Sequence, residues 1–249
     1  MNRFKDKSVV VTGGTSGIGL VCARGFAAEG ARVIITGRDN AALEKARADL
    51  GGGSVALRND VANIADAAAL ASELSTRKIR LDAVFINAGI TKFAALADAT
   101  EALWDATFNT NVKGAYFQLQ ALLPLLNPGA AIVLNGSINA HIGAPGSSIY
   151  AASKAAIISL AKTLSGELLP KGIRVNVISP GPIETPLYDK LGLDATAQQA
   201  VVAQIRNLIP LGRFGKPEEI AATVLHLASS ESAFIVGTEV IMDGGMSQL

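Results

Sequence analysis

The chain has 249 residues, of which 49% are hydrophobic, and its 22 Lys and Arg residues against 21 Asp and Glu residues give a formal net charge of +1. This length suits a single α/β domain that buries roughly three quarters of the surface of its unfolded chain. The balance of charge excludes the one-sided basic surface that nucleic acids or anionic membranes attract. A single cysteine, Cys22, excludes an intrachain disulfide. With two histidines it cannot complete a His/Cys zinc cluster, although carboxylates alone could still hold a cation.

The sequence contains no recognisable targeting or membrane-spanning segment. Residues 1–14 lack an apolar stretch followed by a cleavage site of small residues. Nowhere do about 18 apolar residues run without a charge or a turn signal. We therefore expect a soluble, cytoplasmic protein that binds neither membrane nor nucleic acid, and we expect no metal site.

Short apolar runs alternate with longer segments of helical pattern along the chain. The predicted strands cover residues 8–12, 32–36, 54–57, 83–86, 131–134, 174–178 and 240–242. The predicted helices cover residues 17–28, 40–50, 64–74, 101–123, 149–169 and 217–228. This alternation predicts an α/β fold with a parallel sheet, and the continuous apolar strands indicate helices on both of its faces.

No repeat, low-complexity tract or linker divides the chain, so we expect residues 1–249 to form one domain. The segment 186–210 differs from its surroundings because it lies between turns that contain proline, is polar and alanine-rich, and contains no predicted strand. It follows the carboxyl end of a strand, where ligands bind in such sheets. We expect a mobile lid over a site, and a surface helical insertion is the alternative.

A glycine-rich turn separates the first predicted strand from the first predicted helix, and its sequence is TGGTSGIG at residues 12–19. Glycines let the backbone approach a pyrophosphate closely, and the helix N-terminus offers free N–H groups to the anion. The spacing of Gly13, Gly17 and Gly19 differs from the usual G-x-G-x-x-G, and a plain tight turn would also use glycine. Its position between a strand and a helix favours a dinucleotide-binding site.

The residues after the second predicted strand bear on the choice of cofactor. NAD-specific sites commonly place a carboxylate about 20 residues beyond the glycine turn, where it holds the ribose 2′-hydroxyl. That position is Gly37 here, and the Arg38 that follows could pair with a 2′-phosphate. We therefore expect NADP(H) to be preferred, with NAD(H) as the alternative. Asp39 leaves the choice open because it could neutralise Arg38, which could also be a solvated surface residue.

Tyr150 and Lys154 form a candidate for acid–base chemistry. They lie four residues apart near the start of a predicted helix and so share one face. Ser137 follows the strand 131–134, at the sheet edge where sites form. A tyrosine hydroxyl normally holds its proton tightly, but a nearby ammonium favours the phenolate and allows proton transfer in either direction. On its own this spacing is also a common coincidence on helices.

Six motifs occur together and in a fixed order: TGGTSGIG, Asn87-Ala88-Gly89, Asn111, Ser137, Tyr150-x-x-x-Lys154 and Pro180-Gly181. In this combination the chain resembles the short-chain dehydrogenase/reductase family from Lys7 to about Gly245. It is similar to the ketoreductases and 3-oxoacyl-carrier-protein reductase-like members of the soluble branch of about 250 residues. The resemblance implies a Rossmann-like, doubly wound sheet of seven parallel strands. It also implies an NADP(H)-dependent oxidoreductase that interconverts a ketone and a secondary alcohol.

The resemblance assigns a role to each of four catalytic residues. Tyr150 would donate a proton to the carbonyl oxygen in reduction and accept it in oxidation. Lys154 would assist the tyrosine and hydrogen-bond the nicotinamide ribose. Ser137 would hold and polarise the substrate oxygen, and Asn111 would bind a water that links Lys154 to solvent.

The resemblance also implies cofactor contacts along the ends of the strands. They are Gly13, Thr15, Ser16, Gly17, Ile18, Gly19, Arg38, Asp60, Val61, Asn87, Ala88, Gly89, Tyr150, Lys154, Pro180, Gly181, Ile183 and Thr185. Within this set, Asp60 and Val61 would flank the adenine, and Ile183 and Thr185 would meet the nicotinamide carboxamide. The chain departs from the family pattern at Gly136, where many relatives carry serine, and we expect this glycine to leave more room beside Ser137.

The substrate pocket is expected among residues for which the family has no fixed type. The candidates are Ile90, Thr91, Phe93, Asn139, His141, Ile142, Pro182, Leu187, Tyr188 and the rest of the lid. Most of them are apolar, which favours a small or medium-sized apolar ketone. We expect His141 at the polar edge of the pocket or in solvent rather than as a catalyst.

Three further expectations concern assembly and alternative functions. The resemblance implies a homotetramer, with the helices 101–123 and 149–169 in one interface and the C-terminal strand in another. An epimerase or dehydratase built on the same tyrosine and lysine is one alternative, but such relatives often need a C-terminal substrate domain. A regulatory module that binds NADP without turnover is the other, and it would be expected to lose the tyrosine or the lysine.

Overall fold

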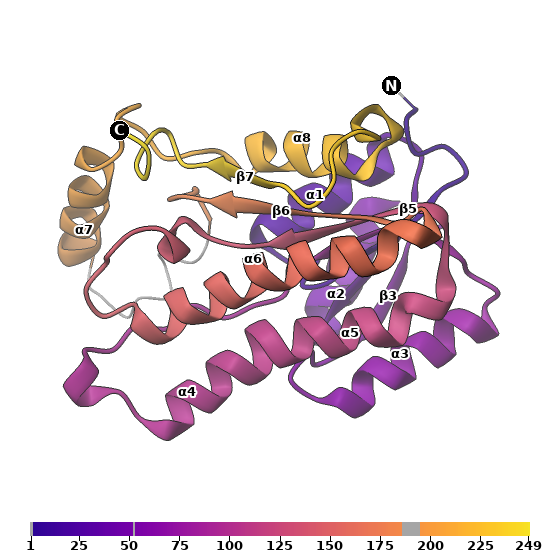
Figure 1. The fold of residues 1–249 in the computed structure, drawn as a ribbon, viewed down its shortest axis with the longest axis horizontal. Helices are drawn as coiled ribbons and strands as arrows, with labels where there is room; N and C mark the ends of the chain where they lie inside the picture. The colour runs from indigo at the N-terminus through magenta and orange to yellow at the C-terminus, as the bar shows by residue number, and fades with distance from the viewer. Residues whose placement is uncertain (1, 52, 186–194) are drawn as a thin grey trace.

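Seven parallel strands form one sheet in the order β3-β2-β1-β4-β5-β6-β7 (Figure 1). The computed structural model describes residues 2–51, 53–185 and 195–249. The strands are β1 (Ser8–Val11), β2 (Arg32–Gly37), β3 (Val55–Arg58), β4 (Leu81–Ile86), β5 (Leu126–Asn135), β6 (Arg174–Pro180) and β7 (Glu239–Met242). The order reverses between β1 and β4, which is the point where doubly wound sheets bind ligands. The predicted seven-stranded parallel sheet is therefore confirmed.

Helices cover both faces of this sheet (Figure 1). One layer contains α1 (Gly17–Ala28), α2 (Asn40–Leu50) and α8 (Pro217–Ala228). The other layer contains α3 (Ile64–Thr76), α5 (Ala115–Leu122) and α6 (Ser148–Leu168), with α4 (Glu101–Phe108) leading into α5. α7 (Ala195–Asn207) lies beyond the carboxyl ends of the strands (Figure 1).

Alternate side chains of each strand feed two separate cores, as the period of two along a strand requires. On β1, Val10 packs with Ile34 in the core under α3, α5 and α6. Val9 and Val11 point the other way and pack with Ile35 beneath α1 and α8. Burial on both sides explains why the strands read as continuous apolar runs.

The helix predicted over residues 101–123 is divided at its centre. A π-helical turn, η2 (Asn109–Gly114), separates α4 from α5. Gly114 lies so close to the loop after β3 that a Cβ atom there would collide with the carbonyl oxygen of Val61. Single π turns inside α-helices occur frequently at functional sites, and this one carries Asn111.

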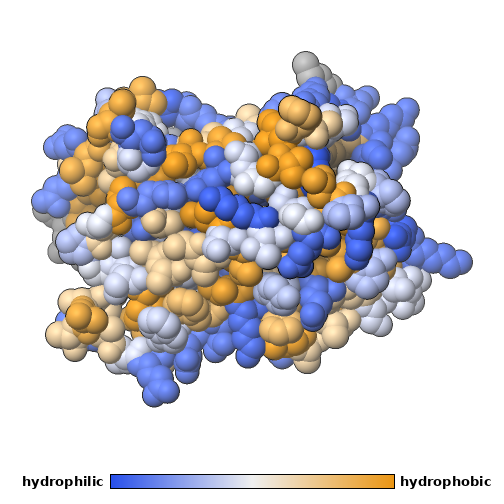
Figure 2. Space-filling view, viewed as in Figure 1, coloured by the Kyte–Doolittle hydropathy of each residue, from blue (hydrophilic) through white to orange (hydrophobic). Residues whose placement is uncertain are grey.

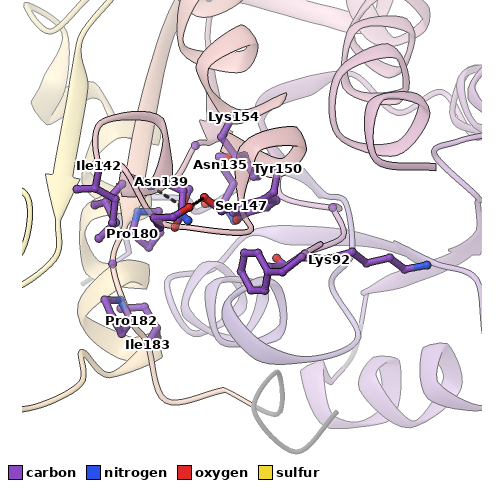
Figure 3. Close-up of a pocket in the computed structure, with 18 of the residues that line it drawn as sticks. Lys92, Asn135, Asn139, Ile142, Ser147, Tyr150, Lys154, Pro180, Pro182 and Ile183 are labelled. Atoms are coloured by element: carbon purple, nitrogen blue, oxygen red, sulfur yellow. Dashed lines mark hydrogen bonds between the residues drawn. The ribbon is translucent and has the colours of Figure 1, made fainter. Parts of the chain in front are cut away.

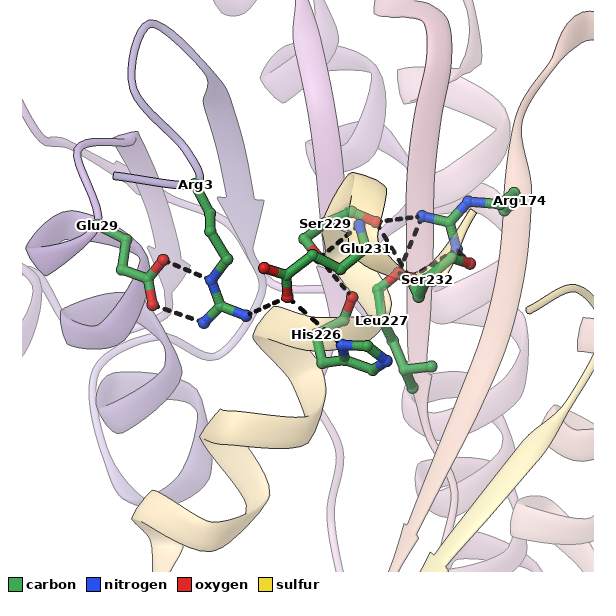
Figure 4. Close-up of polar contacts among 8 residues, drawn as sticks. All are labelled: Arg3, Glu29, Arg174, His226, Leu227, Ser229, Glu231 and Ser232. Atoms are coloured by element: carbon green, nitrogen blue, oxygen red, sulfur yellow. Dashed lines mark hydrogen bonds and ion pairs between the residues drawn. The ribbon is translucent and has the colours of Figure 1, made fainter. Parts of the chain in front are cut away.

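A polar network closes the amino-terminal edge of the sheet (Figure 4). The buried guanidinium of Arg174, at the start of β6, donates to the carbonyl oxygens of Leu227 (3.1 Å) and Ser229 (2.9 Å) at the end of α8. These carbonyls lack partners within the helix, and a cationic side chain is a common way to satisfy them. Arg3 connects the end of α1 to the segment after α8 through Glu29 (2.6 Å) and Glu231 (3.1 Å).

The described part of the expected lid is helical. α7 occupies Ala195–Asn207, and a turn connects it to Pro210. Leu187 and Tyr188, expected in the substrate pocket, lie outside the described residues. None of the described helices is both long and apolar enough to cross a bilayer.

Candidate active site

Two adjoining cavities lie at the carboxyl ends of the strands, with volumes of about 880 Å³ and 890 Å³. They share lining residues from four segments, namely Ile18, Asn87, Gly89, Ile90, Asn135 and Thr185. Most of the predicted site residues therefore lie in one continuous region at the point where the strand order reverses. We call the cavity beside the glycine turn the nucleotide cavity and the other, which contains Tyr150, the reaction cavity.

The glycine turn is shaped by close approach of backbone to backbone. Gly13 and Gly17 have φ angles of 64° and 52°, which only glycine adopts without strain. A Cβ atom on Gly19 would collide with the carbonyl oxygen of Gly13 and would lie 2.5 Å from Asn87 Nδ2. Ser16 is the N-cap residue of α1, but its side chain makes no capping hydrogen bond. The first N–H groups of α1 are thus open toward the nucleotide cavity, as an anion site requires.

Thr12 joins the end of β1 to the end of β4. Its hydroxyl oxygen accepts hydrogen bonds from the backbone N–H groups of Asn87 (2.9 Å) and Ala88 (3.0 Å). The Asn87 side chain returns a hydrogen bond to the carbonyl oxygen of Thr12 at 3.1 Å. Thr12 was not among the predicted site residues, although it begins the TGGTSGIG motif. Thr12 is buried, and through these hydrogen bonds it joins the two strand ends that carry other predicted site residues.

The end of β2 presents an arginine that has no partner in the part of the chain that the structure describes. Arg38 is exposed, lines the nucleotide cavity, and forms no hydrogen bond or ion pair with the described residues. Asp39 does not neutralise it, because the Asp39 carboxylate caps α2 by accepting from the Ala42 N–H at 2.7 Å. A Cβ atom on Gly37 would lie 2.9 Å from the Thr15 methyl group, so a side chain at this position would require Thr15 to shift.

Beyond β3, the predicted adenine contacts have structural partners of their own. Asp60 accepts a hydrogen bond from the Ala62 N–H at 3.1 Å, and both Asp60 and Val61 line the nucleotide cavity. Asn59, which sequence reasoning missed, lies buried beside them and accepts from Gln118 Nε2 at 3.0 Å. This bond ties the cavity wall to α5.

Tyr150 and Lys154 project from one face of α6 into the reaction cavity (Figure 3). Lys154 Nζ donates to the carbonyl oxygen of Asn135 at 2.7 Å and lies 5.8 Å from the centre of the Tyr150 ring. Burial lowers the pKa of Lys154, and the electrostatic effect of Tyr150 opposes that shift. Phe93 packs edge-on against Tyr150, with 5.9 Å between the ring centres. The pair is therefore shielded from bulk water. The electrostatic interaction between the two side chains is stronger in this buried position than it would be in water.

Asn111 connects the π turn to Ile90 and to Ser153, which lie beside Tyr150 and Lys154. Its side chain exchanges two hydrogen bonds with the backbone of Ile90, at 2.8 Å and 3.0 Å. It also donates to Ser153 Oγ at 3.1 Å, and Ser153 donates in turn to the carbonyl oxygen of Tyr150 at 2.7 Å. A Cβ atom on Gly89 would lie 3.1 Å from Asn111 Oδ1 and 3.7 Å from Lys154 Nζ, so glycine keeps these two side chains accessible to each other.

Ser137 lies in the same cavity, on the segment after β5. Its hydroxyl oxygen accepts from the Asn139 N–H at 3.2 Å and caps η4 (Ile138–Ala140). Gly136, which is expected to leave more room beside Ser137, lines the same cavity. A Cβ atom on Gly136 would lie 2.5 Å from Ser179 Oγ and 2.9 Å from Val177 Cγ1 on β6. The glycine is needed because β6 packs directly against it.

Most of the other predicted residues line one of the two cavities. The nucleotide cavity is lined by Gly13, Thr15, Ser16, Gly17 and Ala88. The reaction cavity is lined by Thr91, Phe93, Asn139, Ile142, Pro180, Gly181, Pro182 and Ile183. Lys92 also lies there but extends away from the other labelled side chains (Figure 3). Residues that sequence reasoning missed are Leu103, Pro145, Ser147 and Met246, and no motif marks them.

His141 does not line the reaction cavity. Its Nε2 atom lies 2.7 Å from a carboxylate oxygen of Glu239, at the start of β7. The His141 side chain therefore contacts β7, the strand at one edge of the sheet. The sequence carried no signal for this contact because the two residues lie 98 positions apart.

The fold and this arrangement of strand-end residues define an oxidoreductase built on a dinucleotide-binding sheet. The family model described as enoyl-(acyl carrier protein) reductase matches residues 13–247. The chain belongs to the short-chain dehydrogenase/reductase family. It is 39% identical to the oxidoreductase asL5 of Sarocladium schorii, covering 100% of this chain and 99% of that protein. It is 36% identical to the 3-oxoacyl-[acyl-carrier-protein] reductase of Thermotoga maritima, covering 98% and 99%.

Solved structures agree with this assignment. A short-chain dehydrogenase from Burkholderia cenocepacia, crystallised in complex with NADP, is similar to this chain with a TM-score of 0.89 and 34% identity. The match covers 98% of this chain and 99% of that one. A second structure, a short-chain dehydrogenase/reductase family protein, has a TM-score of 0.86 at 38% identity over the full length of both chains.

Proposed function

We propose that this protein is an NADP(H)-dependent reductase that interconverts a ketone and a secondary alcohol. The observation that carries this proposal is the convergence of Ser137, Tyr150 and Lys154 on one cavity, with Lys154 buried and held by Asn135. An apolar cavity with three adjacent polar groups at one end suits a reaction at a single carbonyl group.

The residues of the nucleotide cavity fit a dinucleotide. The turn at Gly13, Gly17 and Gly19 lets a pyrophosphate approach the backbone, and the open N-terminus of α1 favours its charge. Asn135 Oδ1 is buried between the two cavities and has no hydrogen-bond partner among the described residues, which suits contact with a polar ligand group. Pro180, Gly181, Ile183 and Thr185 would hold the nicotinamide end. When bound, the nicotinamide supplies or accepts the hydride.

In ketone reduction, Tyr150 would give its hydroxyl proton to the carbonyl oxygen, and in alcohol oxidation it would take that proton back. The Lys154 ammonium favours the phenolate that remains. Its position depends on the Asn135 carbonyl oxygen, which orients Nζ without neutralising its charge. Ser137 would donate a hydrogen bond to the same substrate oxygen, and Asn111 would hold the water through which Lys154 recovers a proton.

The preference for NADP(H) rests on Arg38. The Arg38 guanidinium at the end of β2 has no partner among the described residues, so it can form paired hydrogen bonds with a 2′-phosphate. Because position 37 is glycine, it lacks the acidic group that would favour the 2′-hydroxyl of NAD(H). The NADP complex of the Burkholderia relative supports the same choice.

The lining of the reaction cavity supports a small or medium-sized apolar ketone as substrate. Ile90, Phe93, Ile142 and Leu208 surround the polar end formed by Ser137 and Tyr150. The relatives differ in substrate, since one is named a 3-oxoacyl-carrier-protein reductase and another a 2-keto-3-deoxy-L-fuconate dehydrogenase. We therefore assign the reaction class and leave chain length and substituents to experiment.

We also propose a single domain that assembles as a homotetramer. Trp104 and Tyr116 are exposed apolar residues on α4 and α5, and Trp104 stacks on Phe108 with 4.5 Å between ring centres. Figure 2 shows hydrophobic residues interspersed with hydrophilic ones on the face that includes these helices. Sedimentation velocity would test this assembly, and a monomer at micromolar concentration would contradict it.

A panel of ketones and secondary alcohols, assayed with NADPH and with NADH by absorbance at 340 nm, tests the proposed function. We expect NADPH oxidation with at least one activated ketone and NADP⁺ reduction with the corresponding alcohol. Binding of NADPH without turnover of any panel member would contradict the assignment as a ketone reductase and favour a regulatory role.

A further inference from the structure

Glu239 is a shielded carboxylate that the proposed reaction does not use. It begins β7 and pairs with Val177 of β6, whose side chain belongs to the core beneath α6. The Glu239 side chain is 14% exposed. A carboxylate removed from water to this extent needs hydrogen-bond donors, because burial penalises its charge.

Two donors meet this carboxylate from the segment around Ser137 and from β6. Ser179 Oγ donates to Glu239 Oε1 at 2.5 Å, and His141 Nε2 lies 2.7 Å from the same oxygen. A carboxylate oxygen accepts hydrogen bonds, so the His141 Nε2 atom carries a proton in this contact. Glu239 therefore holds one residue of the sheet and one residue of the segment above it.

These contacts reach both ends of the segment that carries Ser137. At its start, Gly136 packs against Ser179, and the Gly136 N–H donates to the Ile178 carbonyl oxygen at 2.7 Å. At its end, His141 is the C-cap residue of η4 and its N–H donates to the Ile138 carbonyl oxygen at 2.8 Å. The turn between them is short and internally hydrogen-bonded, so holding its two ends fixes its orientation.

The Ser137 hydroxyl has no anchor of its own outside this segment. Within the described residues its hydrogen bonds run to Asn139, which belongs to the same turn. Burial of Ile138 keeps the turn against the protein, but apolar contact restricts orientation less than directed hydrogen bonds do. The position of Ser137 relative to Tyr150 consequently depends on Gly136 and His141, and both lead to Glu239.

We propose that Glu239 is a positioning residue that holds Ser137 in register with Tyr150 through Ser179 and His141. This inference rests on the proposed reductase function, in which Ser137 orients the substrate oxygen. Misplacement of a group that binds the transition state lowers turnover more than it lowers ground-state binding. The distinguishing effect is therefore on kcat for the ketone, with the affinity for NADPH unchanged.

Glu239→Ala and His141→Ala remove the contact from its two sides, and Glu239→Gln is the conservative variant because its amide oxygen can still accept both hydrogen bonds. We expect each alanine variant to lower kcat about tenfold, the equivalent of one lost directed contact, and the glutamine variant to remain within about threefold of wild type. His226→Gln is the matched control, since His226 lies at the opposite sheet edge, 3.7 Å from Glu231. A glutamine variant as impaired as the alanine variant would overturn the proposal.

A Ser137→Ala background shows whether the effect passes through Ser137. In this background, Glu239→Ala should lower kcat by less than about twofold, because the hydroxyl group that Glu239 positions is already missing. An undiminished tenfold loss would overturn the proposal. Amide hydrogen exchange of residues 136–147 supplies a readout that does not depend on turnover. Faster exchange in Glu239→Ala supports the proposal even if no ketone is reduced, because the absence of turnover would refute only the proposed function. Unchanged exchange would overturn the proposal that Glu239 positions Ser137.

Discussion

Lys154 is the residue on which the electrostatics of the site depend most strongly. Its ammonium is buried, and within the described residues its one hydrogen bond goes to the Asn135 carbonyl oxygen at 2.7 Å. A charge in such surroundings favours a negative partner within a few ångströms. The Tyr150 phenolate is that partner in the proposed reaction.

Tyr150→Phe should remove ketone reduction while leaving the cofactor site intact. No described residue hydrogen-bonds the Tyr150 hydroxyl, so its loss leaves no broken contact. We expect kcat to fall by about 10²–10⁴-fold, the usual contribution of general acid catalysis. Initial rates at 340 nm and NADPH titration by fluorescence measure the two effects separately. Unchanged turnover would exclude Tyr150 as the proton donor.

Arg38→Leu should distinguish the two nicotinamide cofactors. Loss of a charge-assisted contact to a 2′-phosphate is expected to weaken NADPH binding about 10–100-fold and to leave NADH binding nearly unchanged. Arg47→Leu is a suitable control, because Arg47 lies on α2 and already pairs with Glu44 at 2.9 Å. Equal losses for both cofactors would mean that Arg38 does not contact the 2′-phosphate.

At the scale of elements, the site depends on places where regular structure is interrupted. The π turn η2 places Asn111 between Ile90 and Ser153, and it fits against the loop after β3 only because Gly114 lacks a side chain. The junction of β1 and α1 depends in the same way on Gly19. In both cases the constraint comes from a neighbouring backbone carbonyl oxygen.

Two glycine-to-alanine substitutions inside helices should have opposite effects. In Gly19→Ala the new Cβ collides with the Gly13 carbonyl oxygen, so α1 must shift and NADPH binding should be lost. In Gly166→Ala, on α6, the new Cβ meets nothing within 4 Å, and the better helix propensity should stabilise the protein by about 0.5–1 kcal/mol. Thermal unfolding and NADPH titration test both variants. Stabilisation by Gly19→Ala would contradict the described packing.

The sequence was informative where a local pattern determines the outcome. Strand ends in a parallel sheet meet at one edge, so Gly13, Asn87, Ser137 and Tyr150 could be placed together from their positions after strands or at a helix start. The orientation of His141 toward Glu239 could not be predicted. It depends on tertiary packing between segments that are distant in the chain, and no local spacing encodes it.

At the scale of the whole molecule, the sheet separates two apolar cores. Cys22 belongs to the core beneath α1 and α8 and is fully buried. Burial also raises the pKa of its thiol, which keeps the reactive thiolate scarce. The single cysteine is therefore a natural reporter of opening between α1 and α8.

Cys22 should react with a thiol reagent such as DTNB only when the protein opens. We expect labelling of the native protein to be at least about 100-fold slower than labelling in urea, and slower still with saturating NADPH, because a ligand that binds the native state stabilises it. Absorbance at 412 nm follows the reaction. Rapid labelling under native conditions would show that the α1–α8 layer opens readily.

The network of Arg3 and Arg174 (Figure 4) lies at the amino-terminal ends of the strands, and both cavities lie at their carboxyl ends. This separation has a consequence for how such a protein can diversify. The segments around the reaction cavity can change in sequence without disturbing the ties that join α1, α8 and β6. New substrate selectivity is thus accessible by mutation at little risk to folding, and directed evolution of this enzyme would begin most productively with residues 90–93 and 142–145.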